Sequence, residues 1–126
     1  MASGTRAGAW VGTVVHARAP LSVEQVVEGR WVLVRVEGEV DSLTAGTLCA
    51  SLADAELNVS PPAPVVVDLT GVSFLGAAGL SVLVDHHERC VALGTALLIV
   101  PGSKPVRRVI AVTGLDTRLA LIPAPR

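Results

Sequence analysis

The sequence predicts an α/β domain in which a mixed β-sheet of four to five strands is covered by helices, in the order β-β-α-β-α-β-α-β. Three observations predict this fold class. A pair of alternating apolar segments lies near residue 30, a nearly all-valine run follows near residue 66, and stretches of helical periodicity separate the later apolar runs. The chain has 126 residues, 51% of them hydrophobic, which suffices for one domain with one core. We expect the domain at residues 21–122, with tails at 1–20 and 123–126.

The N-terminal part predicts a tail followed by a β-hairpin. Residues 1–20 are rich in Gly, Ala and Arg and have no clear period, and Trp10–His16 is the one stretch there that could form a short edge strand. Leu21–Glu28 and Trp31–Glu37 are predicted strands, joined by a tight turn at Gly29–Arg30. The second strand alternates valines with larger or charged residues, as a strand with one buried face does.

The middle of the chain predicts a helix and a buried strand. Gly38–Ser42 breaks the second strand, and Asp41 or Ser42 can cap the helix that follows. The apolar face of this helix has i, i+3, i+4, i+7 spacing and consists of Ala45, Leu48, Cys49, Leu52 and Ala55. Ser60–Pro62 ends the segment, and the valine-rich Pro64–Leu69 is typical of a strand in the middle of a sheet.

The next part predicts a loop and a second helix. A loop that carries Phe74 leads to a helix at about Ala77–Leu93, and Gly94 stands where that helix should end. The inward stripe of this helix is Leu80, Leu83, Val84, His87 and Val91. We therefore expect a partly buried, hydrogen-bonded His87 and an exposed His86.

The C-terminal part predicts a strand, a helix and a last short strand. Thr95–Val100 is nearly all apolar and should form another central strand. Ser103 caps a third helix, which has Pro105 in its first turn and Gly114 at its end. The buried face of this helix is Val106, Val109 and Ile110. Arg118–Ile122 is the closing strand.

Composition excludes two classes of partner. Only 2% of the residues are aromatic and the net charge is -1, so the chain lacks the stacking rings and the basic surface of a nucleic-acid-binding protein. The best candidate for a membrane span, Leu69–Val84, is too short and contains three glycines. The first residues have no apolar core of a signal peptide, which favours the cytoplasm.

The sequence also lacks the catalytic motifs that were sought. Gly71 and Gly76 have the spacing of a phosphate-binding loop, but Ala77 and Ala78 stand where that loop needs a lysine and a hydroxyl residue. No other nucleotide-binding or hydrolase motif is present in the sequence. We therefore predict that the protein is not an enzyme and needs no cofactor.

Histidines and cysteines do not assemble into a site by spacing alone. A catalytic triad of Ser81, Asp85 and His87 would require the side chains of Asp85 and His87 to point the same way. Residues two apart on a helix face different ways. Cys49 and Cys90 are too few for a zinc cluster or a disulfide framework, and Cys49 lies on an apolar stripe. No metal site is predicted.

The run of small residues Gly76–Gly79 at a helix start is the most distinctive feature. It leaves backbone N–H groups exposed together with the positive end of the helix dipole. Such a place suits an anion or a closely approaching protein. It also suits a tight strand-to-helix turn that needs glycine only for its backbone. The pattern alone leaves these alternatives open.

Three segments resemble the STAS domains, specifically the single-domain bacterial anti-sigma-factor antagonists. Gly38–Ala45 is similar to the family's Gly-Glu-Leu-Asp-x-x-Thr-Ala. Asp68–Leu75, followed by Gly79–Leu80, is similar to its Asp-Leu-Ser-x-Val-x-Phe-Met-Asp-Ser-Ser/Thr-Gly-Leu, from which Gly76–Ala78 depart. Val106–Leu115 looks like its last helix, which ends in Gly-Leu. The likeness covers about Leu21–Leu121 and keeps the predicted element order.

The resemblance implies partner switching in transcription regulation. An unphosphorylated antagonist binds an anti-sigma factor, typically a kinase of the GHKL ATPase type, and so frees a sigma factor. Phosphorylation of the first Ser of Asp-Ser-Ser/Thr-Gly ends the association. Here Ala77 holds the phosphoacceptor position, so that switch cannot operate. The partner-binding residues implied are Asp41, Ser42, Thr44, Ser73, Leu75, Gly76, Ala77, Ala78 and Gly79.

Three roles follow from the resemblance. The favoured one is an antagonist that stays in the unphosphorylated-like state, as a cytoplasmic monomer or weak dimer. The alternatives are a STAS accessory subunit of a lipid-transport ABC complex or stress-signalling scaffold, and a small-ligand or nucleotide-binding STAS domain. Cys49 and Cys90 lie on helices expected to share one face of the sheet, so redox control is a further hypothesis beside two ordinary core thiols.

Overall fold

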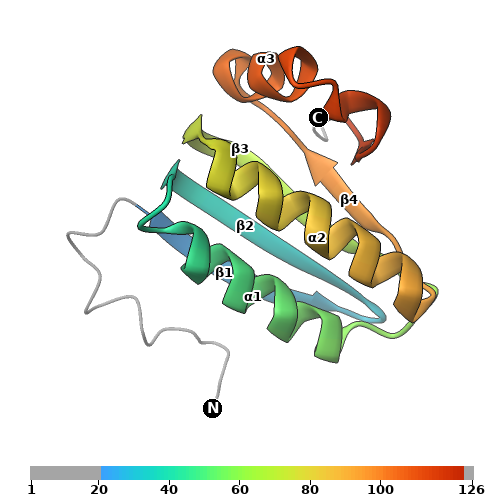
Figure 1. The fold of residues 1–126 in the computed structure, drawn as a ribbon. Helices are drawn as coiled ribbons and strands as arrows, with labels where there is room; N and C mark the ends of the chain where they lie inside the picture. Colours follow the sequence, from blue (N-terminus) through green and yellow to red (C-terminus); the bar gives the residue numbers. More distant parts are fainter. Residues whose placement is uncertain (1–20, 124–126) are drawn as a thin grey trace.

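The computed structural model describes residues 21–123 and has the predicted element order (Figure 1). Its elements are β1 Leu21–Glu28, β2 Trp31–Val40, α1 Ala45–Asn58, β3 Val65–Leu75, α2 Ala77–Leu93, β4 Leu97–Val100, α3 Lys104–Val112, a 3₁₀ turn Leu115–Thr117 and β5 Ala120–Leu121. The α/β class and the mixed sheet are thereby confirmed. The edge strand predicted at Trp10–His16 falls outside the described residues.

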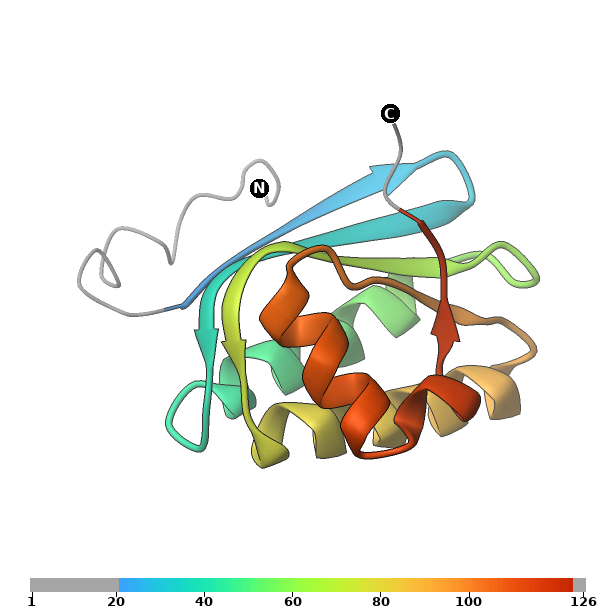
Figure 2. The ribbon, with the colours of Figure 1, turned by 90° about the horizontal axis from the view of Figure 1, so that it is seen from above.

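The five strands form one sheet in chain order, β1-β2-β3-β4-β5. β1 and β2 pair antiparallel across the tight turn at Gly29–Arg30, as predicted, and every later pair is parallel. Each later strand is added on the same side of the one before it. When such strands are connected by right-handed crossovers, the connecting helices lie on one face of the sheet. α1 and α2 lie side by side on such a face, and α3 lies beyond them on the side of β4 (Figures 1 and 2).

The covered face of the sheet carries the core. Alternate residues of β2 and β3 are buried there: Val32, Val34, Val36, Val65, Val67 and Leu69. The helices add the fully buried Leu48, Leu52, Leu83 and Ile110. Residues between these positions point to the other face, where Arg35 Nε lies 3.8 Å from Asp68 Oδ2. The period of two in the sequence therefore separates a buried face from a polar one.

Two strands run further than the sequence predicts. β2 continues to Val40, so the strand does not end at Gly38 as the sequence predicts. β3 continues to Leu75. Phe74 therefore lies in a strand and the predicted loop is wrong. The extensions pair with each other across two register shifts, and Val40 is opposite Leu75. Because a shifted register interrupts the regular alternation of apolar residues, the sequence pattern ended both strands too early.

The buried face of α2 also differs from the prediction. It consists of Gly79, Leu80, Leu83, His86 and Cys90. Val84 is only partly buried, and Val91 is 62% exposed. His86, and not His87, is the buried histidine with a hydrogen bond, because its Nδ1 lies 2.5 Å from Glu56 Oε2. A buried imidazole needs such a partner, and a pattern within one helix cannot reveal a partner on another.

The ends of the later elements agree only in part with the sequence. Gly94 and Gly114 follow their helices with left-handed φ of 81° and 78°, as predicted. Ser103 precedes α3, but its hydroxyl donates to the Val72 carbonyl oxygen at 3.0 Å and does not cap the helix. β4 begins only at Leu97, and β5 is two residues long because the 3₁₀ turn precedes it.

Candidate docking surface

The carboxyl ends of β2 and β3 bring two of the sequence motifs together. Val40 and Leu75 are the last residues of these strands and are paired in the sheet. One residue further on, the N–H of Gly76 donates to the Val40 carbonyl oxygen at 2.8 Å. The turn that starts at Asp41 and the helix that starts at Ala77 therefore leave the sheet next to each other.

Asp41 and Thr44 build the turn between β2 and α1. Asp41 Oδ1 accepts hydrogen bonds from the N–H groups of Leu43 and Thr44, at 2.9 and 3.1 Å. The Thr44 hydroxyl accepts one from the Asp41 N–H at 2.9 Å and donates to the Glu39 carbonyl oxygen at 2.8 Å. Asp41 thus caps the turn, and Thr44 takes the N-cap position of α1. Since both are occupied internally, the turn presents Ser42 and Leu43 to solvent.

Small residues form the first turn of α2. Gly76 is its N-cap residue, and no side chain caps the helix. Ala77 is exposed and Ala78 is partly buried. Gly79 is buried, and a Cβ at this position would lie 2.6 Å from side-chain atoms of both Leu75 and Val40. Close packing of α2 on the two strand ends therefore accounts for Gly79, while the first turn keeps its N–H groups near the surface.

The exposed part of this region combines apolar and polar side chains, and the exposed Glu39 is paired with Phe74 in the sheet. We define the candidate docking surface as Ser42, Leu43, Ser73, Phe74 and Ala77, all of which are exposed. Leu43 is 90% exposed and Phe74 is 50% exposed. Ser73 directs its hydroxyl at the Gly38 carbonyl oxygen, 3.3 Å away. Leu43 and Phe74 are therefore the two large apolar side chains that a partner could contact at this end of the sheet.

The residues implied by the resemblance divide into three groups by exposure. Ser42, Ser73 and Ala77 are exposed, and Asp41, Gly76 and Ala78 are partly buried. Thr44, Leu75 and Gly79 are buried and support the surface from below. Leu43 and Phe74 reach solvent but were absent from the predicted set. The signal for Leu43 was an apolar side chain inside an otherwise polar turn. Phe74 could have been found only if the longer β3 had been predicted.

Both cysteines are free thiols in the interface between α1 and α2. Cys49 is partly buried, less than predicted from its apolar stripe, and its Sγ lies 3.4 Å from His86 Nε2. Cys90 is fully buried with its Sγ 3.9 Å from Glu56 Oε2. Burial, with the Glu56 carboxylate, raises the pKa of the Cys90 thiol to about 11. Redox control through Cys49 and Cys90 stays a hypothesis beside that of two ordinary core thiols, and thiol counting with and without reductant tests it.

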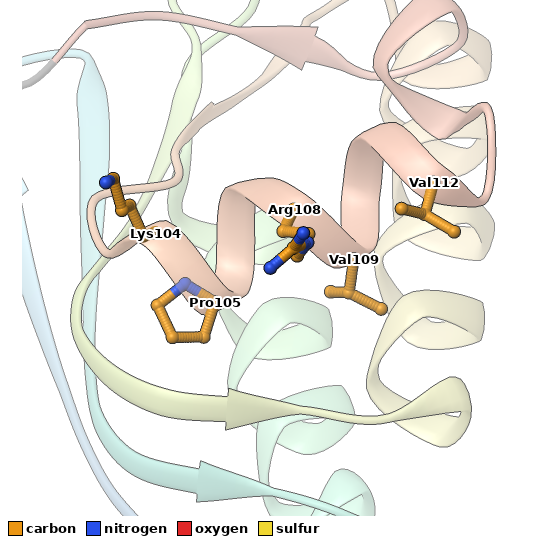
Figure 3. Close-up of a pocket in the computed structure, with 5 residues that line it drawn as sticks. All are labelled: Lys104, Pro105, Arg108, Val109 and Val112. Carbon is orange, nitrogen blue, oxygen red and sulfur yellow. The ribbon is translucent and has the colours of Figure 1, made fainter.

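A second surface feature lies along α3. A shallow hollow of about 720 Å³ is lined by Lys104, Pro105, Arg108, Val109 and Val112 (Figure 3). All five side chains come from one helix, so the hollow is open on one side. Lys104 and Arg108 take part in no salt bridge within residues 21–123.

Among the described residues, no group of three His, Cys, Asp or Glu side chains could hold a metal ion. None of the described helices has the length and apolar character to cross a membrane.

The chain belongs to the STAS domain family. A model of that family matches residues 22–124, which is most of the chain. The mixed sheet with its alternating helices is the STAS fold of the solved neighbours. The family predicted from the sequence motifs is thereby confirmed.

Several relatives are anti-sigma factor antagonists. The anti-sigma-F factor antagonist RsfA of Mycobacterium tuberculosis is 29% identical over 92 residues, which are 73% of this chain and 72% of RsfA. A candidate anti-anti-sigma factor of the same species is 30% identical over 95 residues, 75% of this chain. This chain spans 64% of the length of that protein.

Solved structures agree with these relatives. An anti-sigma factor antagonist from Mycobacterium paratuberculosis is 31% identical, with a TM-score of 0.68, over 82% of this chain and 86% of that one. The unphosphorylated form of the anti-sigma factor antagonist SpoIIAA has a TM-score of 0.68 over 83% of this chain and 90% of its own. At 19% identity the SpoIIAA structure supports the fold alone.

Proposed function

We propose that this protein is an anti-sigma-factor antagonist, which binds an anti-sigma factor and so frees a sigma factor. A fold does not define a function by itself, so the proposal depends on the site. The observation that carries it is the hydrogen bond from Gly76 to Val40, which joins the Asp41–Thr44 turn to the start of α2. The names of the relatives support the same role.

The proposed docking mode is an apolar contact around a helix N-terminus. Leu43 and Phe74 supply exposed apolar area, and Ala77 lets a partner approach the first turn of α2 closely. Uncapped N–H groups of that turn can donate to carbonyl or carboxylate oxygens of the partner. The partner is then an anti-sigma factor of the GHKL kinase-like type. The protein acts in the cytoplasm, by binding and not by catalysis, as a monomer or weak dimer.

The absence of a hydroxyl at position 77 makes the binding insensitive to the partner's kinase activity. A phosphoserine there would add nearly two negative charges to the docking surface. Ala77 has no oxygen to receive a phosphoryl group. Ser73 is engaged with the Gly38 carbonyl, and Ser81 lies one turn into α2, so neither takes the place of the missing residue. The amount of protein, or another modification, then has to control the association.

Two leucines on opposite ends of the domain test the docking surface. We expect Leu43→Ala to raise the Kd for the anti-sigma factor about tenfold, because an anchor of that kind contributes roughly 1.4 kcal/mol. Leu57→Ala is the matched control, since Leu57 is 83% exposed in the last turn of α1, far along the helix from the turn. It should leave the Kd unchanged. Isothermal titration calorimetry against each GHKL-type anti-sigma factor of the source genome measures both.

Absence of binding to every such anti-sigma factor would refute the function. Binding that weakens equally in both leucine variants would keep the function but remove the docking surface from this end of the molecule. Thermal unfolding of the two variants should match the unmodified protein, because both side chains are exposed.

A further inference from the structure

We propose that Cys49 is a nucleophilic thiol, activated by His86 and Glu56, and a site of modification by hydroperoxides. The three side chains form a continuous chain across the interface between α1 and α2. Cys49 Sγ lies 3.4 Å from His86 Nε2, and His86 Nδ1 lies 2.5 Å from Glu56 Oε2. A nucleophile, a base and a group that orients the base are the three parts by which proteins activate a thiol or hydroxyl. The inference does not depend on the docking function.

Glu56 fixes the histidine in the orientation that this role requires. The side chains of His86 and Glu56 are 4% and 3% exposed, so little water competes for their hydrogen bond. The carboxylate accepts from Nδ1–H, which leaves Nε2 as the ring atom that faces the thiol. Arg89 donates from Nε to Glu56 Oε1 at 3.0 Å and compensates the buried negative charge.

Cys90 provides an internal contrast to Cys49. Its thiol is fully buried near Glu56 Oε2, and burial with the adjacent carboxylate raises its pKa to about 11. Cys90 is therefore protonated at neutral pH and shielded from reagents. Cys49 is partly exposed and faces a base. One chain thus holds an activated thiol and an inert one within the same helix pair.

The reaction balances with a hydroperoxide as the oxidant. The Sγ–H proton moves to His86 Nε2, and the thiolate attacks one oxygen of the peroxide. The S–O bond forms as the O–O bond breaks, so the sulfur is oxidised to a sulfenic acid and the peroxide is reduced. The leaving oxygen takes the proton from His86 and departs as water or an alcohol. The charged and titratable groups that face the site are Cys49 and Glu56 from α1, and His86, Arg89 and Cys90 from α2.

The test uses the full chain with Cys90→Ser, in which Cys49 is the sole thiol. Sulfenic acid formed by hydrogen peroxide at pH 7 is trapped with dimedone and mapped by mass spectrometry. We expect native Cys49 to react at least about tenfold faster than the same protein unfolded in urea, since a positioned base typically contributes that much or more. The matched variant Cys49→Ser should leave Cys90 unmodified until the protein unfolds.

Two further variants show whether the neighbours activate the thiol. In the Cys90→Ser background, His86→Gln and Glu56→Gln should each lower the native rate about tenfold. The His86→Gln rate should also rise between pH 6 and 8, as it does for an ordinary thiol with a pKa near ~8.5. The rate with His86 in place should exceed the His86→Gln rate throughout that range.

Three results would overturn the proposal. Native Cys49 could react no faster than in urea, a comparison that needs no change within the cluster. Cys90 could react as fast as Cys49. A folded His86→Gln variant could keep the full rate and the same pH profile, which would leave the histidine with a structural role only.

Discussion

Replacing Ala77 with Asp is expected to weaken binding of the anti-sigma factor about 100-fold while leaving the domain folded. The new carboxylate would be desolvated against an apolar partner surface, and an unpaired charge in such a contact costs roughly 3 kcal/mol, which is about 100-fold in Kd. In the free protein the same carboxylate lies at the start of α2, where the helix dipole favours it by about 0.3–1 kcal/mol. Affinity and stability should therefore change in opposite directions.

Ala92→Asp is the matched control for this change. Ala92 is exposed in the last turn of the same helix, so the substitution adds the same charge at the other end. It should leave the affinity unchanged and slightly lower the melting temperature, because a carboxylate near a helix C-terminus is unfavourable. Calorimetric titration and thermal unfolding measure the two quantities. Equal loss of affinity in both variants would contradict the placement of the surface.

Replacing Gly79 with Val is expected to lower the free energy of unfolding by about 3 kcal/mol, the upper range for overpacking a filled site. The first added carbon alone would lie 2.6 Å from side-chain atoms of Leu75 and Val40. α2 would have to move away from the strand ends to make room. A loss of this size lowers the melting temperature by more than about 10 °C in a domain of roughly 100 residues.

Gly46→Val makes the same change at a helix start with open space around it. Apart from its chain neighbours and the backbone of its own helix, no heavy atom would lie within 4 Å of a Cβ at Gly46. Valine is no worse than glycine inside a helix, so stability should change by less than about 0.5 kcal/mol. Urea unfolding of both variants separates packing from helix propensity. Equal losses would show that Gly79 is not required by contact with the strands.

Much of the fold could be predicted because its determinants are local. Valines at every second position of β2 and the all-valine start of β3 defined the strands, and Gly94 and Gly114 marked helix ends that the structure confirms. Features that depend on another element were predicted wrongly. The far end of β3 exists because it pairs with the end of β2, and His86 is buried because Glu56 meets it from α1.

The candidate site could likewise be predicted only in part. Motifs in the sequence identified the Asp41–Thr44 turn and the start of α2, and the structure brings them together. Exposure could not be read from the motifs, since the Thr44 hydroxyl turns inward to the Glu39 carbonyl while Leu43 faces solvent. Which residue supports a surface and which forms it depends on hydrogen bonds within the turn.

The most direct test of the central claim is the response of the complex to ATP. The protein is bound to its kinase-type anti-sigma factor, magnesium and ATP are added, and phosphate incorporation and dissociation are followed together. The unmodified chain should take up no phosphate and stay bound, whereas Ala77→Ser should be phosphorylated at residue 77 and released. Phosphorylation of the unmodified chain, at Ser73 for example, followed by its release would contradict the account.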